Sequence, residues 1–145
     1  MKDALKIKGN FQMKAYDVDG NLLWEYEDDN LVVTTGRASM ANLLGAATAP
    51  NKHITHIHYG TNGADPVLSD TAITAPFAKA VDAVSYPAPG SVQFDFSLGL
   101  TENNGVTIRE YGLISADTTL FARKTRAPIV KDNTISLTGT WTITI

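Results

Sequence analysis

The chain contains no cysteine among its 145 residues, and this absence removes several kinds of chemistry at once. Disulfide bridges, thiolate zinc sites and cysteine nucleophiles all need a sulfur atom that the sequence does not supply. Long apolar runs are missing as well, so no segment predicts a membrane span or a secretory leader. We therefore expect a soluble, unprocessed chain that owes its stability to an apolar core.

An excess of positive charge is also missing. Lys and Arg number 12 against 15 Asp and Glu, which gives a formal net charge of -3. A surface without a basic field holds phosphates poorly, so nucleic acid and anionic membranes are not expected as partners. At this length a single domain, residues 1–145, buries roughly two-thirds of its surface, and no linker or internal repeat divides the sequence.

The most regular pattern in the chain is the segment 135–145, which alternates without a break between apolar or glycine positions and hydroxyl positions. Successive side chains of a strand point to opposite faces, so the Ile, Leu and Trp side chains are expected inside and a Ser/Thr row outside. Such a strand has to be paired, because a long free edge recruits other chains. The segment 91–101 alternates in the same way and is predicted to be a core strand.

Further strand signals recur about every ten residues, with glycine and proline between them. Residues 1–28 are expected to form an N-terminal hairpin packed on the domain, with its turn at Asp17–Asn21. The acidic residues 27–30 are interpreted as a loop, residues 61–76 as a loop wrapping the outside of the core, and residues 78–86 as either a strand or a helical turn. The fold class is therefore mainly β: an antiparallel β-sandwich, jelly-roll-like, with one short helix.

That helix is expected near residues 36–45. The hydroxyl residues Thr34 and Thr35 are typical N-caps, apolar residues follow at helical spacing, and Gly45 is a typical helix end.

Three histidines lie within six residues, at His53, His56 and His58. In a strand, His56 and His58 share a face while His53 has the opposite parity, so two imidazoles would need a third ligand from elsewhere. His56 and His58 are accordingly weak metal candidates, and no metal or other cofactor is predicted. Ordinary strand histidines, a metal at a subunit interface and a pH-sensitive contact stay open as interpretations.

No residue pattern supports catalysis. Carboxylate pairs such as Glu102 with Glu110 lie in no recognisable motif, and neither a serine nucleophile elbow nor a phosphate-binding glycine loop is present. We predict that the protein is not an enzyme.

Charged residues do occur within apolar strand segments, at Arg109, Glu110 and Arg123. A pair between Glu110 and either arginine could fix the strand register or dock a neighbouring subunit, and a solvated strand face is the alternative. Together with the outward threonines of the last strand, these residues are the predicted assembly contacts: Thr138, Thr140, Thr142, Thr144, Arg109, Glu110 and Arg123.

Several segments, taken in order, resemble a known family. They are the run 30–37 before the short helix, Ile57-His58-Tyr59-Gly60-Thr61, Ile108-Arg109-Glu110-Tyr111-Gly112-Leu113-Ile114, Leu120-Phe121-Ala122-Arg123, Ile129-Val130-Lys131 and the final Trp-Thr-Ile strand. This series is similar to the amino-terminal domains of tailed-bacteriophage tail-collar and tail-fibre proteins, and it covers roughly residues 30–145. Fibre proteins continue into a long shaft, whereas the present sequence has none.

The resemblance implies mostly β structure and assembly on a virion, commonly as trimers, and it implies no catalytic residues. We therefore expect a structural subunit made in the cytoplasm of a bacterial host: a tail, baseplate or fibre-attachment adaptor that contacts copies of itself and neighbouring virion proteins through strand edges and its threonine face. The alternatives are a capsid decoration protein of the phage head and a host-surface glycan-binding module. The second would stack sugars on Trp24, Tyr26, Tyr59 or Tyr86.

Overall fold

The computed structural model describes residues 7–145, which form one sheet and one helix. The strands pair antiparallel in the order β4-β3-β7-β8-β2-β1-β9-β6-β5. This architecture confirms the mainly β, sandwich-like class with a short helix. The elements are β1 (Lys8–Tyr16), β2 (Leu22–Val32), α1 (Thr34–Gly45), β3 (Ile54–Gly60), β4 (Phe77–Ala80), β5 (Ala83–Ser85), β6 (Ser91–Leu98), β7 (Val106–Ser115), β8 (Leu120–Lys131) and β9 (Ser136–Thr144).

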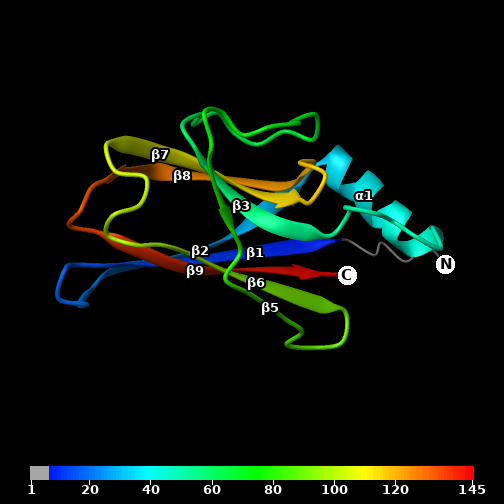
Figure 1. The fold of residues 1–145 in the computed structure, drawn as a ribbon, viewed down its shortest axis with the longest axis horizontal. Coiled ribbons are helices and arrows are strands. Elements are labelled where there is room, and N and C mark those ends of the chain that lie inside the picture. Colours follow the sequence, from blue (N-terminus) through cyan, green and yellow to red (C-terminus); the bar gives the residue numbers. More distant parts are fainter. Residues whose placement is uncertain (1–6) are drawn as a thin grey trace.

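Strand β2 belongs to both layers of the curled sheet. Its residues 22–30 pair with β1, and then Leu31 and Val32 pair with Arg123 and Ala122 of β8. We call β2, β1, β9, β6 and β5 the β1 layer, and β8, β7, β3 and β4 the β7 layer; Figure 1 shows one lying over the other. The predicted loop at residues 27–30 is therefore wrong, because the acidic run lies where one continuous strand leaves the first layer for the second.

The other side of the sandwich is bridged by the segment that sequence patterns left undecided. Strands β4 and β5 stand at opposite ends of the strand order, yet only Val81 and Asp82 separate them in the chain. The Val81 amide donates to the Thr55 carbonyl at 3.0 Å, and the Asp82 amide donates to the Asp95 carbonyl at 2.7 Å. The chain thus connects the two ends of the strand order, and the end strands themselves, of four and three residues, offer little free edge to other chains.

Aromatic side chains fill the space between the layers. Phe11 of β1 lies 5.0 Å from Trp141, 5.1 Å from Tyr111 and 5.4 Å from Phe96, measured between ring centroids. The predicted alternation of the last strand is confirmed, since Leu137, Trp141 and Ile143 are buried while β9 pairs with β1 on one side and β6 on the other. Each such buried side chain contributes about 1.5–3 kcal/mol relative to leaving it in water.

The N-terminal hairpin is part of the sheet rather than packed on it. β1 runs between β2 and β9, and residues 1–6 of the predicted hairpin lie outside the described residues. The predicted turn is confirmed: Gly20 has φ +80°, and an Asp17 carboxylate oxygen accepts hydrogen bonds at 2.9 Å from the amides of Asp19 and Asn21.

Helix α1 is confirmed, although its predicted cap is wrong. The helix begins at Thr34 after Val33, without a side-chain cap, and the Thr35 hydroxyl donates instead to the Leu120 carbonyl of β8 at 2.6 Å. Gly36 allows this close approach, since a Cβ atom there would collide with the Phe121 carbonyl oxygen. Among residues 7–145, no helix has the length and apolar character needed to cross a membrane.

The loop 61–76 covers the outer face of the β7 layer, and Figure 1 shows it rising above that layer. Its Ile73 is buried in a small second cluster with Val33, Ile114 and Leu120. Gly112 of β7 leaves room for Ile73, because a Cβ atom there would approach Ile73 Cγ1 to 2.6 Å. The loop therefore converts an outward strand face into a second, smaller core.

Candidate functional site

Glu110 and Arg123 were expected as assembly contacts, and as surface contacts they are wrong. Their side chains are 1% and 2% exposed, because loop 61–76 lies over them. The register shift between Ile108 and Glu110 turns Glu110 away from the main core and toward that loop. The expected pairing itself is confirmed: Arg123 Nε donates to Glu110 Oε2 at 2.8 Å.

The buried pair acts as a clamp on loop 61–76. Arg123 also donates to the carboxylate of Asp70 and to the carbonyl of Asn62, both at 3.0 Å. The second oxygen of Glu110 accepts from the backbone amides of Thr74 at 2.6 Å and Asn62 at 3.3 Å. Both charges are therefore compensated by groups from the two ends of one loop, which gives them a structural role.

Arg109, the third charged contact candidate, is half-buried in β7 beside this loop. A Cβ atom added to Gly63 would lie 3.2 Å from Arg109 Cδ, so the arginine stem passes along the glycine. Arg109 makes no ion pair with the described residues, and its role in assembly stays a prediction.

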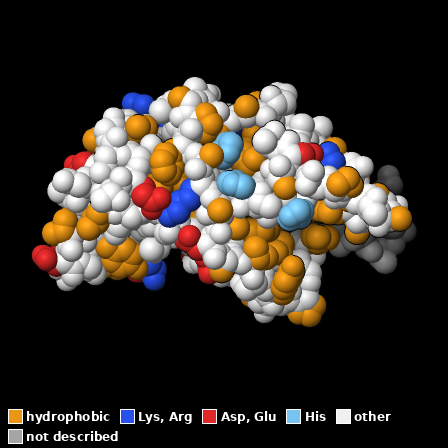
Figure 2. Space-filling model, in the orientation of Figure 1, with side chains coloured by type: hydrophobic (Ala, Val, Ile, Leu, Met, Phe, Trp, Pro, Cys, Tyr) orange, Lys and Arg blue, Asp and Glu red, His pale blue; other side chains and the backbone are white. Residues whose placement is uncertain are grey.

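The histidines do not form a metal site with other described residues. His56 is exposed and His58 is half-buried in β3, and burial together with neighbouring His56 lowers the pKa of His58. Within residues 7–145 there is no group of three potential ligands around them. Figure 2 shows the histidine side chains on one face of the molecule. The pairing of β3 with β7 is irregular between Ile54 and His56, so the simple strand alternation that placed His53 on the opposite face from His56 does not hold there.

The predicted threonine row lies on the outer face of the β1 layer. Thr144 exchanges a hydrogen bond with the Ser91 hydroxyl at 2.9 Å, and the Thr142 hydroxyl is 3.5 Å from the amide oxygen of Gln93. Thr138 and Thr140 make no side-chain hydrogen bond with the part of the chain that the structure describes. They line a groove instead.

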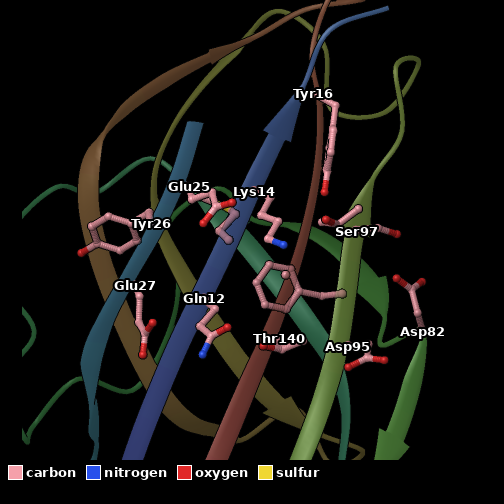
Figure 3. Close-up of a pocket in the computed structure, with 14 residues that line it drawn as sticks. Gln12, Lys14, Tyr16, Glu25, Tyr26, Glu27, Asp82, Asp95, Ser97 and Thr140 are labelled. Atoms are coloured by element: carbon pink, nitrogen blue, oxygen red, sulfur yellow. The ribbon is translucent and has the colours of Figure 1, made fainter. Parts of the chain in front are cut away.

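This groove hollows the outer face across four strands and has a volume of about 690 Å³. Figure 3 shows its side chains rising from β2, β1, β9 and β6, with Asp82 at the rim. Two rows of outward residues cross the face in register. The first row holds Glu27, Gln12, Thr140 and Asp95, and the second holds Glu25, Lys14, Thr138 and Ser97.

Negative charge dominates the groove. Glu25 and Glu27 stand on one wall and Asp82 and Asp95 on the other, and Lys14 is the single cation among the described residues that line the groove. None of these groups forms an ion pair with the described residues, although five other carboxylates of the chain do. Like charges that converge without compensation repel one another, so the face is electrostatically prepared for a cationic group.

Sequence patterns alone missed these carboxylates. The alternation of residues 91–101 gives Asp95 the outward parity, but the four acidic residues come from three separate segments of the chain. Only the strand order β2-β1-β9-β6 brings them to one face.

A second, apolar hollow of about 490 Å³ lies at the end of the sandwich near α1. Leu44 is 83% exposed and Tyr86 is 78% exposed at its margin. Figure 2 shows hydrophobic side chains gathered over the β5–β6 end of the molecule. Exposed apolar surface that gathers in one place is typical of contact regions between proteins.

The aromatic residues considered for glycan stacking are differently placed. Tyr59 is fully buried and donates its hydroxyl to the Ser97 carbonyl at 3.0 Å, so it is wrong as a stacking platform. Trp24 and Tyr26 are half-buried, and the Arg126 guanidinium lies 4.2 Å and 4.8 Å from their ring centroids. Of the four, Tyr86 alone is highly exposed.

These features define an antiparallel, sandwich-like β protein with a clamped outer loop, a polar groove on one face and an apolar hollow at one end. Comparison with protein-family models, curated proteins and solved structures finds no match.

Proposed function

We propose that the protein is a non-enzymatic structural subunit of a tailed-phage virion, a tail, baseplate or fibre-attachment adaptor that assembles with copies of itself and with neighbouring virion proteins. The observation that carries the proposal is the role of the segments that resemble phage tail-collar and tail-fibre domains. Glu110 and Gly112 of the segment 108–114 and Arg123 of the segment 120–123 hold loop 61–76 on the sheet. A motif whose residues build the architecture is what a family of structural proteins would share.

The surface supports an assembly role through two features. The groove presents the hydroxyls of Thr138 and Thr140 between charged walls, and such side chains suit a wet protein interface. The apolar hollow near α1 offers the surface that a more tightly packed contact would bury.

The decisive experiment is to find the protein on the particle. Mass spectrometry of separated heads and tails, from the phage whose genome encodes the chain, should detect it in tails. Detection in heads instead would favour the capsid decoration alternative. Absence from both fractions, for a protein that is expressed during infection, contradicts a virion role.

Assembly is tested separately on the purified protein. Light scattering after size exclusion should give an oligomer, with a trimer favoured, or binding to virion parts. Replacing Thr140 and Thr142 by lysine should weaken that association while leaving the fold intact, since both side chains point away from the core. A strict monomer without affinity for phage particles contradicts the proposal.

A further inference from the structure

We infer that the groove on the outer face of the β1 layer receives an extended, lysine- or arginine-bearing segment of another virion protein. The inference rests on the proposed function for the source of the partner, and on the groove itself for the partner's chemistry. The groove's four carboxylates and one lysine sum to -3, which equals the net charge of the entire chain. The other charged residues of the chain therefore sum to a net charge of zero.

The spacing of the walls suits a single extended segment. Adjacent strands lie about 4.8 Å apart, so the three intervals from β2 to β6 separate Glu27 from Asp95 by roughly 14 Å. A chain along the middle would be about 7 Å from each wall, which is within the Debye length of about 8 Å at physiological salt. Alternate side chains of an extended segment point in opposite directions, so lysines on both sides would each meet a carboxylate.

The floor supplies neutral groups for the same segment. Thr138 and Thr140 lie between the walls without side-chain partners among residues 7–145, and the Gln12 amide stands beside them in register. Hydroxyl and amide groups can bind the backbone of the segment directly or through water. Lys14 lies opposite Glu25 in the strand register but forms no ion pair with a described residue, so the groove keeps a negative net charge.

A second copy of this chain does not supply the matching charge from its described residues. Lys52, Lys79, Arg123 and Lys124 are held in ion pairs, and Arg126 is stacked on two aromatic rings. Lys131 is buried, with its ammonium bonded to Asn104 and to the Asp132 carbonyl. The other described cations are spread over β1, α1 and β7, so they form no basic strip within residues 7–145.

Titration with capped pentalysine, followed by ¹H–¹⁵N NMR, tests the inference. The amide shifts that move should lie on β2, β1, β9 and β6 around the groove, and the affinity should fall as salt is raised from about 0.05 M to 0.5 M. Pentaglutamate and fully acetylated pentalysine are the matched probes and should not bind.

The double variant Glu25→Gln/Asp82→Asn removes two groove charges without removing a side-chain hydrogen bond. Since each exposed ion pair is worth about 0.2–1 kcal/mol, pentalysine affinity should fall about 2- to 30-fold. The control Asp19→Asn/Asp65→Asn changes the net charge equally at two exposed positions outside the groove and should leave affinity unchanged.

Equal losses in both double variants would mean that net charge alone matters, and this would overturn the inference. So would shifts that fall outside the groove, or no binding at low salt by a protein whose spectrum shows it folded. If Glu25→Gln/Asp82→Asn instead changes the protein's own oligomeric state and pentalysine does not bind, the occupant is a second copy. All these results are independent of whether the protein is found on virions, so the two proposals can fail separately.

Discussion

Removing the charge of Glu110 should destabilise the protein far more than the same change at an exposed glutamate. In Glu110→Gln, an amide nitrogen must replace one of two oxygens that both accept hydrogen bonds. One oxygen accepts from Arg123 Nε at 2.8 Å and the other from the Thr74 amide at 2.6 Å. In either orientation of the glutamine, its NH₂ group would face another hydrogen-bond donor, either Arg123 Nε or the Thr74 amide. Arg123 would then keep only Asp70 as a charged partner.

Removing one partner of a buried ion pair costs about 3–5 kcal/mol when the remaining charge is left uncompensated. In Glu110→Gln, only the partly exposed Asp70 would still compensate the charge of Arg123. A domain is typically stable by only about 5–15 kcal/mol, so the variant should lose a large fraction of its free energy of unfolding. Urea denaturation followed by the fluorescence of Trp24 and Trp141 measures this loss. The midpoint should fall markedly while the denaturant slope stays constant.

Glu102→Gln is the matched control, since Glu102 also accepts from a cation and from a backbone amide. Lys79 Nζ lies 2.8 Å from Glu102 Oε1, and the Gly99 amide donates to the same oxygen. The side chains of this pair are partly exposed, however: Lys79 by 25% and Glu102 by 32%. Solvent-screened pairs contribute about 0–1 kcal/mol, so this variant should be only slightly destabilised. A loss for Glu110→Gln no larger than that for Glu102→Gln would refute the clamp.

Three further predictions follow from particular contacts. Hydrogen bonds from Lys52 and Ser115 hold the pKa of Asp117 well below its ordinary value in the folded protein. As pH falls below about 4, the Asp117 carboxylate of the unfolded chain therefore takes up a proton before that of the folded protein, and the stability that these hydrogen bonds contribute is lost. Urea midpoints between pH 2 and 6 should show a steeper acid-side decline for the wild type than for Asp117→Asn, and parallel curves would contradict this. Gly60→Ala should lower the free energy of unfolding by about 1–3 kcal/mol, measured by urea denaturation. The added Cβ atom would lie 2.8 Å from the Thr74 carbonyl oxygen and 2.5 Å from Glu110 Oε1. Gly45→Ala is the control, since nothing lies within 4 Å of the Cβ position there. Gly36→Ala should likewise lower the thermal midpoint by pushing α1 from β8, and an unchanged midpoint would show that the helix can shift freely.

Local patterns in the sequence were sufficient for much of the fold. The alternation of residues 91–101 and 135–145 placed Phe94, Phe96, Leu137 and Trp141 inside, because strand geometry fixes the two faces whatever the strand's neighbours are. The Asp-Gly turn and the short helix were also predictable, since both depend on a few adjacent residues. Residues 27–30 were misread because their acidic composition concealed a strand that changes partners.

The candidate site depended on contacts between distant segments. Glu110 and Arg123 carry the same charges on a solvated strand or in a buried clamp, and only the position of loop 61–76 distinguishes the two cases. Glu25, Asp82 and Asp95 converge because the strand order brings β2 and β6 to either side of β1 and β9.

The sequence by itself determined that the protein is a mainly β domain and which side chains of its regular strands face inward, since these follow from periodicity and turn chemistry along the chain. Tertiary structure alone decided which outward faces reach solvent, because burial of an outward residue depends on segments far away in sequence. For this reason the threonine row was foreseen but the charged groove around it was not.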